Sequence, residues 1–126
     1  MQSQWHFLGD IQEKKAGEIE AVCYIPADSP WFEGHFPGEP ILPGIALVHT
    51  VQQAILQSAQ KKTEQVKLVE LKRVRFVQPV RPGEKLHLNV TREETKQGGD
   101  EVVFSFKILN GENIVSSGLI IGKKMK

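Results

Sequence analysis

Residues 31–49 read WFEGHFPGEPILPGIALVH, and this stretch decides how the rest of the sequence is interpreted. Three prolines and three glycines surround a single histidine, His35, before an apolar pattern of helical period begins. Proline restricts φ and glycine permits tight turns, so the segment is expected to form a shaped loop. We expect the loop to present His35 at the start of a helix, and the two together to form a functional site.

The helix is expected to begin at about Pro43, because proline is favoured at the first helical position. One stripe of apolar or small side chains recurs at helical spacing, and its members are Leu47, Val48, Val51, Ala54, Ile55 and Ser58. A second, mixed stripe contains Ile45, His49, Gln52, Gln53 and Leu56, in which His49 and Gln53 are neighbours four residues apart. Because residues 45–60 are almost uncharged, we expect a central helix that is covered on most sides.

The other segments favour β-strands. Residues 5–13 have a short, mixed pattern, whereas residues 18–26, 66–80, 85–93, 102–108 and 114–121 are rich in alternating or β-branched residues. Turns are expected at residues 15–17, 81–84 and 97–100, and at Asn110-Gly111 as a type I′ candidate. Since the last four strands follow one another through tight turns, we expect an antiparallel meander curled around the helix, which is an α+β fold.

The composition is that of one globular domain spanning residues 1–126, with 40% hydrophobic and 25% charged residues. A chain of this size buries roughly two thirds of the surface that it exposes when unfolded. The 16 basic and 15 acidic side chains leave a net charge of +1, which does not favour nucleic acid or an anionic membrane as a partner. No apolar run approaches the roughly 18 residues of a membrane span, so we expect a cytoplasmic protein.

The cysteine and histidine content does not indicate a metal site. The single cysteine, Cys23, lies in an alternating segment and is interpreted as a buried strand thiol. The four histidines lack metal-ligand spacing, and His6 and His87 are interpreted as surface or edge residues. We therefore expect no bound metal.

Two stretches resemble the β-hydroxyacyl-acyl-carrier-protein dehydratases, which have the hot-dog fold. The first is Gly-His-Phe-Pro at residues 34–37, followed by Leu-Pro-Gly at residues 42–44 and a helix. The second is FVQPVRPGE at residues 76–84, where a strand ends in a proline- and glycine-containing turn. Both occur in the family's order, and the resemblance extends from about residue 9 to residue 121. It implies an antiparallel sheet wrapped around one long central helix.

The resemblance also implies roles for individual residues. In that family a loop histidine removes the α-proton of a 3-hydroxyacyl thioester, a helix carboxylate handles the departing hydroxyl, and N–H groups at the helix start polarise the carbonyl. His35 matches the base, Gly44 matches the helix-start glycine, and Gln53 matches a glutamine of the helix. The acid position falls on His49. This departure resembles dehydratase-like proteins of aryl-polyene pathways, in which the position is not the usual glutamate.

The same chemistry has a physical basis in these residues. Free N–H groups after Pro43 would stabilise an enolate oxygen, and Gly44 would let the acyl group approach the backbone closely. An imidazole with a reference pKa near 6.5 serves as base or acid, so a neutral His35 and a protonated His49 could work as a pair. Two nearby cations would, however, disfavour each other. The catalytic candidates are His35, His49 and Gly44; the substrate-binding candidates are Phe36, Pro37, Ile41, Pro43, Ile45, Val48, Gln53 and Phe76.

The expected reaction is dehydration of a 3-hydroxyacyl thioester to the trans-2-enoyl thioester in a fatty-acid-like biosynthesis. The substrate would be linked to acyl carrier protein or coenzyme A, and no cofactor is expected beyond the phosphopantetheine of the substrate itself. Two alternatives stay open. One is a hot-dog acyl thioesterase, and the other is a non-catalytic, acyl-binding partner subunit of a dehydratase.

The resemblance further implies partners. Family members pair their sheets edge to edge and place the histidine and the acid in different subunits, so we expect a homodimer or higher oligomer. A heterodimer with a related subunit would allow that subunit to supply the missing carboxylate. The basic residues Lys72, Arg73 and Arg75, with Arg81 and Lys85, are either the solvated face of a strand or a surface that attracts an acidic carrier protein.

Overall fold

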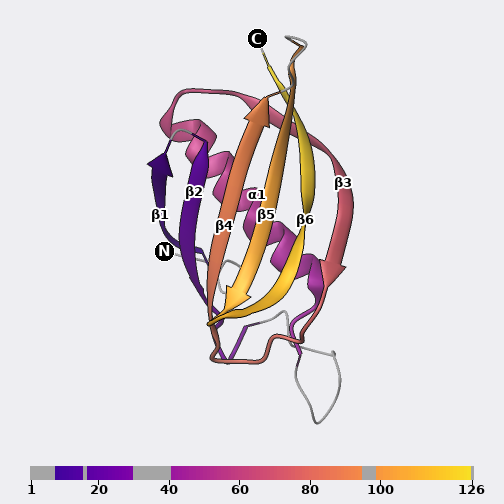
Figure 1. The fold of residues 1–126 in the computed structure, drawn as a ribbon. Coiled ribbons are helices and arrows are strands. Elements are labelled where there is room, and N and C mark those ends of the chain that lie inside the picture. The colour runs from indigo at the N-terminus through magenta and orange to yellow at the C-terminus, as the bar shows by residue number, and fades with distance from the viewer. Residues whose placement is uncertain (1–7, 16, 30–40, 95–98, 126) are drawn as a thin grey trace.

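The computed structural model describes residues 8–15, 17–29, 41–94 and 99–125. Its elements, in chain order, are β1 (Leu8–Lys15), β2 (Glu18–Tyr24), α1 (Gly44–Lys61), β3 (Val66–Phe76), β4 (Lys85–Glu94), β5 (Glu101–Asn110) and β6 (Asn113–Lys124). Within these ranges the strands form one antiparallel sheet of six strands, and α1 crosses behind it in the view of Figure 1. The expected α+β fold, a sheet around one long helix, is confirmed.

The strand order differs from the expected four-strand meander. The order is β1-β2-β4-β5-β6-β3. Of the four strands expected to form the meander, β4, β5 and β6 lie side by side in chain order, whereas β3 lies at the edge beside β6. The turn before β4 is bonded to the end of β2, because Ile25 N–H donates to the Glu84 carbonyl at 3.0 Å and Gly83 N–H donates to the Ile25 carbonyl at 2.8 Å. These bonds start β4 beside β2, so that β5 and β6 lie between β4 and β3 in the sheet.

One strand end and one turn differ from the sequence prediction. β3 stops at Phe76 rather than at residue 80, and the Val77 N–H then donates to the Val115 carbonyl at 2.8 Å. In the β5–β6 turn Asn110 pairs with Asn113, and Gly111 has a φ of 62°. Only the first central residue has a positive φ, which fits a type II′ turn, so the type I′ assignment was wrong. The expected turns at residues 15–17 and 97–100 lie partly outside the described residues.

The core forms where the first stripe of α1 packs on the inner face of the sheet. That stripe is buried as expected, and the alternating residues of β4 and β5 that meet it are Leu86, Leu88, Val90, Phe104, Phe106 and Ile108. Phe106 is paired with Gly118 in β6, where an added Cβ would lie 3.0 Å from the ring. Cys23 is buried in this core, and desolvation raises the pKa of its thiol to about 12. It is therefore an inert strand thiol, as expected.

The other side of α1 is open in this chain. Ile45 and Leu56, from the mixed stripe, are 59% and 39% exposed. The expectation that α1 is covered on most sides therefore does not hold for the chain by itself. The helix begins at Gly44, one residue later than expected, and Pro43 is its N-cap residue with φ −63° and ψ 145°.

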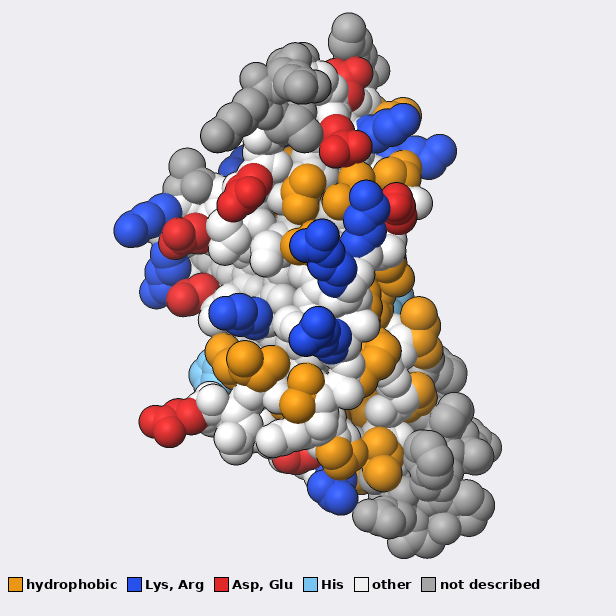
Figure 2. All heavy atoms as spheres, turned by 45° about the vertical axis from the view of Figure 1, so that its right-hand side comes forward, with side chains coloured by type: hydrophobic (Ala, Val, Ile, Leu, Met, Phe, Trp, Pro, Cys, Tyr) orange, Lys and Arg blue, Asp and Glu red, His pale blue; other side chains and the backbone are white. Residues whose placement is uncertain are grey.

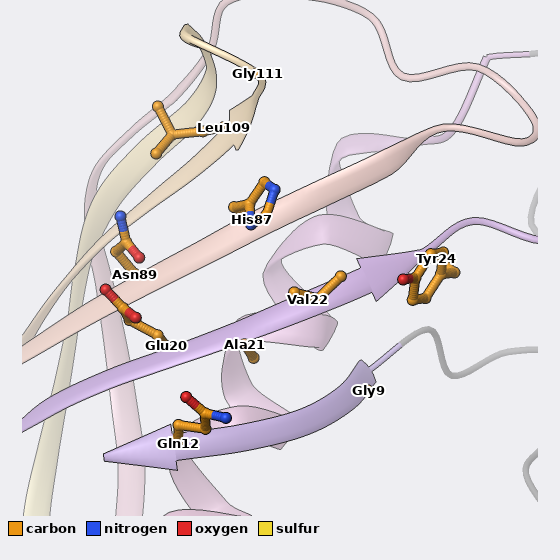
Figure 3. Close-up of a pocket in the computed structure, with 10 residues that line it drawn as sticks. All are labelled: Gly9, Gln12, Glu20, Ala21, Val22, Tyr24, His87, Asn89, Leu109 and Gly111. Carbon is orange, nitrogen blue, oxygen red and sulfur yellow. The ribbon is translucent and has the colours of Figure 1, made fainter. Parts of the chain in front are cut away.

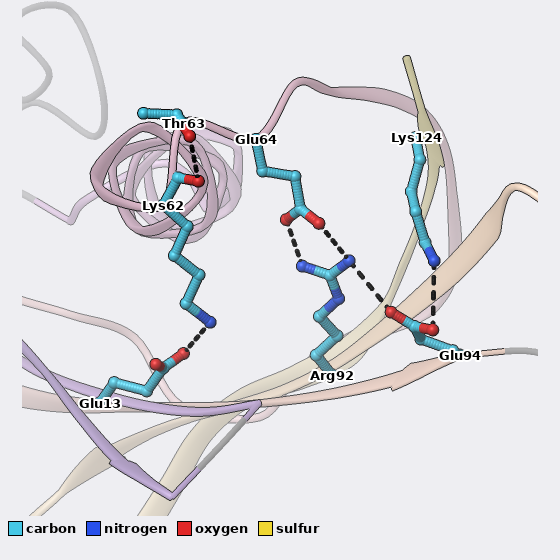
Figure 4. Close-up of polar contacts among 7 residues, drawn as sticks. All are labelled: Glu13, Lys62, Thr63, Glu64, Arg92, Glu94 and Lys124. Carbon is cyan, nitrogen blue, oxygen red and sulfur yellow. Dashed lines mark hydrogen bonds and ion pairs between the residues drawn. The ribbon is translucent and has the colours of Figure 1, made fainter. Parts of the chain in front are cut away.

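A network of charged side chains holds the C-terminal end of α1 to the sheet (Figure 4). Lys62 forms an ion pair with Glu13 of β1 at 2.5 Å. Arg92 of β4 binds both carboxylate oxygens of Glu64, with an Nη2–Oε2 distance of 2.8 Å, and also contacts Glu94 at 3.3 Å. The hydrogen bond from Arg92 holds the pKa of Glu64 below its usual value. This fork-to-fork geometry is the stronger form of an ion pair.

We predict that Glu64→Gln lowers the free energy of unfolding by about 1 kcal/mol at neutral pH, because it removes a partly buried charge-assisted pair. A carboxylate whose folded-state pKa is lowered stabilises the fold above its unfolded-state pKa and loses that contribution as the pH falls through the folded-state value. The difference from wild type should therefore vanish in acid. Urea unfolding at several pH values measures this, with Glu93→Gln, on the strand that carries Arg92, as the control. An equal difference at every pH would contradict the assignment.

Candidate active site at the start of the helix

The first turn of α1 offers backbone donors. Pro43 caps the helix without a side-chain hydrogen bond, and the first turn contains no acidic residue. Ala46 N–H donates to the Pro43 carbonyl at 3.0 Å. The N–H groups of Gly44 and Ile45 therefore precede the first N–H group that is hydrogen-bonded within the helix. Such groups carry the positive end of the helix dipole and attract a carbonyl or developing oxyanion.

The segment leading into α1 is fixed to the turn that follows β3. Leu42 N–H donates to the Val80 carbonyl at 2.7 Å, and both side chains are buried. Arg81 N–H donates to Glu84 Oε1 at 2.5 Å, which closes the turn. The two stretches that carry the family resemblance therefore meet in space. Ile41, a predicted substrate-binding residue, is half-buried beside this junction.

Phe76 contacts the first residue of the helix. A Cβ added to Gly44 would lie 2.6, 2.7 and 2.9 Å from Cζ, Cε1 and Cε2 of the Phe76 ring, far closer than real Cβ atoms approach. The distal end of the ring thus fills the space of the missing side chain. Sequence reasoning expected Gly44 to make room for substrate, whereas the structure shows that it makes room for Phe76, which is itself 54% exposed.

Other predicted site residues follow along the helix. His49 and Gln53 are half-buried and lie one turn apart, on the same side as the exposed Ile45. Val48 is buried but does not belong to the main core cluster. His35, Phe36 and Pro37 lie outside the described residues, so their placement and their roles stay predictions.

The described ranges do not indicate a metal centre or a membrane-spanning helix. No group of three or more His, Cys, Asp or Glu side chains in those ranges is arranged to hold a metal ion. No helix in the same part of the chain is both long and apolar enough to cross a membrane.

A basic surface lies on the outer face of the sheet, opposite α1. Arg75 of β3 and Lys107 of β5 both lie beside Ser117 of β6. Lys72 of β3 pairs with Leu119, two residues further along β6. Figure 2 shows Lys and Arg side chains gathered in the middle of this side, with hydrophobic side chains below them and along the right-hand edge. We call Lys72, Arg75 and Lys107 the basic surface.

The basic surface differs from the sequence expectation in its members. Lys85 lies on β4, where its Nζ is 5.6 Å from the centre of the Tyr24 ring, with two strands between it and β3. Lys107 was not among the expected residues. Its outward position between the buried Phe106 and Ile108 was the available signal, but the neighbouring strand order was needed to place it near Arg75.

A hollow of about 590 Å³ lies on the outer face of β1, β2 and β4. Figure 3 shows Gln12, Glu20, His87 and Asn89 standing on this face, with α1 behind the sheet. His87 is exposed, as expected. The hollow is separated from the start of α1 by the sheet and is not part of the candidate active site.

Comparison with known proteins identifies the family. The family model for the ApeI dehydratase matches residues 11–119, so the chain belongs to the ApeI-like dehydratases. The 3-hydroxyacyl-[acyl-carrier-protein] dehydratase FabZ of a Nitratiruptor species is 29% identical over 126 residues, covering 92% of this chain and 80% of that protein. FabZ of Klebsiella pneumoniae is 36% identical over 86 residues, which cover 64% of this chain and 57% of that protein.

Solved structures confirm the hot-dog fold. The dehydratase heterocomplex ApeI:P from Xenorhabdus doucetiae matches with a TM-score of 0.68 and 24% identity, covering 96% of this chain and 98% of that chain. An uncharacterised protein from Erwinia carotovora matches with a TM-score of 0.66 and 26% identity, covering 94% and 93%. An uncharacterised protein from Pyrococcus horikoshii matches with a TM-score of 0.73 and 20% identity, covering 96% and 85%.

Proposed function

We propose that this chain catalyses the dehydration of a 3-hydroxyacyl thioester to the trans-2-enoyl thioester. The observation that carries the proposal is the start of α1, where N–H groups are free of a side-chain cap and no acidic residue of the first turn competes for them. Membership of the ApeI-like family and similarity to FabZ support the choice of reaction. The acyl group is proposed to arrive on the phosphopantetheine of an acyl carrier protein, with coenzyme A as the other source.

In the proposed reaction the thioester oxygen accepts hydrogen bonds from the N–H groups at the helix start. A neutral His35 takes a proton from C2, and the enolate that forms is stabilised by these donors and by the helix dipole. The enolate then expels the hydroxyl group at C3. A protonated His49 gives that group a proton, so that water leaves, and exchange with solvent restores both imidazoles.

The residue at position 49 decides between this reaction and a second function. A carboxylate would offer two acceptor oxygens to orient a hydroxyl or a water, whereas a protonated imidazole offers only donors. If His49 does not supply the proton, the chain would be the acyl-binding partner of a related subunit that carries a carboxylate. That alternative is supported by the similarity to a chain of the ApeI:P assembly, which is described as a dehydratase heterocomplex.

We further propose that a second subunit pairs with β3. Among the described strands β3 is an edge, bonded only to β6, and it carries exposed Val69 and Leu71 along 11 residues. Ile45 and Leu56 of α1 are also exposed, and Gln52 from the same stripe of the helix lines a hollow together with Val69 and Leu71 of β3. A long edge strand that exposes apolar side chains is an aggregation hazard unless another chain covers it. A homodimer, or a heterodimer with a relative, would cover both the strand and the open side of the helix.

The basic surface is proposed to receive an acidic carrier protein. Arg75 and Lys107 form no ion pair within the described ranges, so their charge is available to a partner. Arg75 directly precedes Phe76, which contacts the helix start, and this places the basic surface next to the candidate site along β3. Complementary charge would mainly raise the rate of association and lose its effect as salt is added.

The reaction is tested by incubating the purified protein with 3-hydroxyacyl pantetheine thioesters of several lengths and analysing the products by mass spectrometry. We expect an enoyl thioester that has lost water, whereas release of free thiol would identify a thioesterase instead. His35→Ala should reduce the rate by at least about a hundredfold, because the general base is lost. A near wild-type rate in that variant would overturn the assignment.

His49→Glu tests the acid position. We expect the variant to retain or exceed the wild-type rate, because a carboxylic acid at this position supplies the proton and the acceptor oxygens. A folded but inactive His49→Glu protein, alongside an active wild type, would show that residue 49 does not act as the acid. Circular dichroism of both proteins provides the control for folding.

Leu71→Asp tests the β3 interface. We expect sedimentation at micromolar concentration to show a dimer or larger assembly for wild type and a monomer for the variant, because the substitution buries a charge at the interface. Tyr24→Asp, which changes an exposed aromatic residue on β2, is the matched control and should leave the assembly intact. A wild-type monomer with full activity would contradict the proposed arrangement.

The carrier surface is tested with a variant that combines Arg75→Glu and Lys107→Glu. At low salt we expect its kcat/KM for a carrier-linked substrate to fall at least about tenfold. The value for the same acyl group on free pantetheine should stay unchanged. Lys85→Glu, on β4 with two strands between it and Arg75, is the control. An equal fall in kcat/KM with both substrates would show that the substitutions act on the candidate active site and not on docking of the carrier.

A further inference from the structure

We propose that the Phe76 ring determines which acyl thioesters fit at the start of α1, admitting chains that are unbranched at C2 and excluding those with a C2 substituent. The inference rests on the proposed thioester chemistry at this site and adds a specificity-determining residue to it. The sequence predicted Phe76 only as one of several substrate-binding residues. Its contact with Gly44 gives it a more defined position.

The contact places the ring beside the proposed carbonyl-binding N–H group. In Gly44 the backbone nitrogen and the position that a Cβ would occupy are both attached to the same Cα atom. Three atoms of the Phe76 ring lie 2.6 to 2.9 Å from that Cβ position. An oxygen held by the N–H would lie about 2.9 Å from the nitrogen. The ring and the bound thioester group would therefore be immediate neighbours.

The backbone of Phe76 is held in place on both sides. Phe76 pairs with Ser116 of β6, and Ser116 Oγ donates to the Arg75 carbonyl at 2.8 Å. Val77 N–H donates to the Val115 carbonyl at 2.8 Å. Only rotation of its own side chain can move the ring away from Gly44, and a substrate that needs more room must force that rotation.

The consequence for the substrate concerns the carbon next to the thioester carbonyl. Apolar atoms need about 4 Å of separation from the ring, so a methyl group on C2 would compete for space that the ring already borders. An unbranched chain has only hydrogen atoms at C2 and avoids this conflict. Gly44 and Phe76 thus act together: the glycine admits the ring, and the ring narrows the approach to the helix start.

Val77 provides a matched control. It follows Phe76 directly and is exposed, but it is not among the nearest atoms to the Gly44 Cβ position. Val77→Ala removes apolar atoms from the same segment without opening the space beside Gly44. A change of selectivity in Phe76→Ala that is absent in Val77→Ala is therefore attributable to the ring.

The experiment compares 3-hydroxyoctanoyl pantetheine with its 2-methyl derivative in wild type, Phe76→Ala and Val77→Ala. We expect wild type and Val77→Ala to prefer the unbranched substrate roughly tenfold to hundredfold in kcat/KM, the range over which one methyl group is discriminated. In Phe76→Ala the preference should fall by at least about tenfold. If Phe76→Ala does not fold, Phe76→Leu is used in its place. An unchanged preference in the folded Phe76 variant would overturn the inference.

A binding measurement separates this inference from the reaction itself. Octanoyl and 2-methyloctanoyl pantetheine thioesters, which keep the carbonyl but lack the 3-hydroxyl group and so cannot be dehydrated, are titrated by calorimetry into the same proteins. If no variant dehydrates any thioester but the ratio of dissociation constants shifts in Phe76→Ala alone, the proposed reaction fails and the inference stands. If dehydration occurs, but neither the ratio of kcat/KM values nor the ratio of dissociation constants depends on Phe76, the inference fails and the reaction stands.

Thermal unfolding tests the contact without any ligand. Gly44→Ala should lower the unfolding midpoint of wild type, because the new Cβ would collide with the ring. The same substitution should have a smaller effect in the Phe76→Ala background, where the ring is gone. Equal effects in both backgrounds would show that the ring does not occupy this space in solution and would overturn the inference.

Discussion

The burial of one stripe of α1 on the inner face of the sheet determines where the other parts of this protein lie. Val51, Ala54 and Ile55 are almost completely inaccessible, so the helix can neither rotate nor slide without opening a cavity. Its first turn is thereby held at the end of β3, where Phe76 meets Gly44. Its last turn is held by the Arg92 and Glu64 network. The candidate site is a consequence of how the core fixes the helix.

The sequence predicted the elements well and their arrangement less well. Alternation identified the strands that face the core, and the Pro-Gly pair at residues 43–44 located the helix start within one residue. The position of β3 beside β6 could not be read from local patterns, because it depends on hydrogen bonds between the end of β2 and the turn before β4. The same limit concealed the proximity of Lys107 to Arg75, which lie on different strands and become near neighbours only through β6.

The candidate site was predicted in outline because its donors are backbone groups, and their presence follows from a proline and a glycine at a helix start. The role of Phe76 was not predicted, because a glycine that accommodates substrate and a glycine that accommodates a ring look alike in a sequence. The exposed side of α1 was also unexpected. Its residues include His49, so the proposed acid lies toward the side that a second subunit would cover.

The central claim is that a thioester bound at the start of α1 loses a proton from C2. Deuterium incorporation at C2 of a 3-hydroxyacyl pantetheine in heavy water, followed by mass spectrometry, measures that step separately from loss of the hydroxyl group. We predict that the wild-type protein introduces deuterium at C2 and that His35→Ala does not. Binding of the thioester with neither exchange at C2 nor formation of the enoyl thioester would contradict this claim.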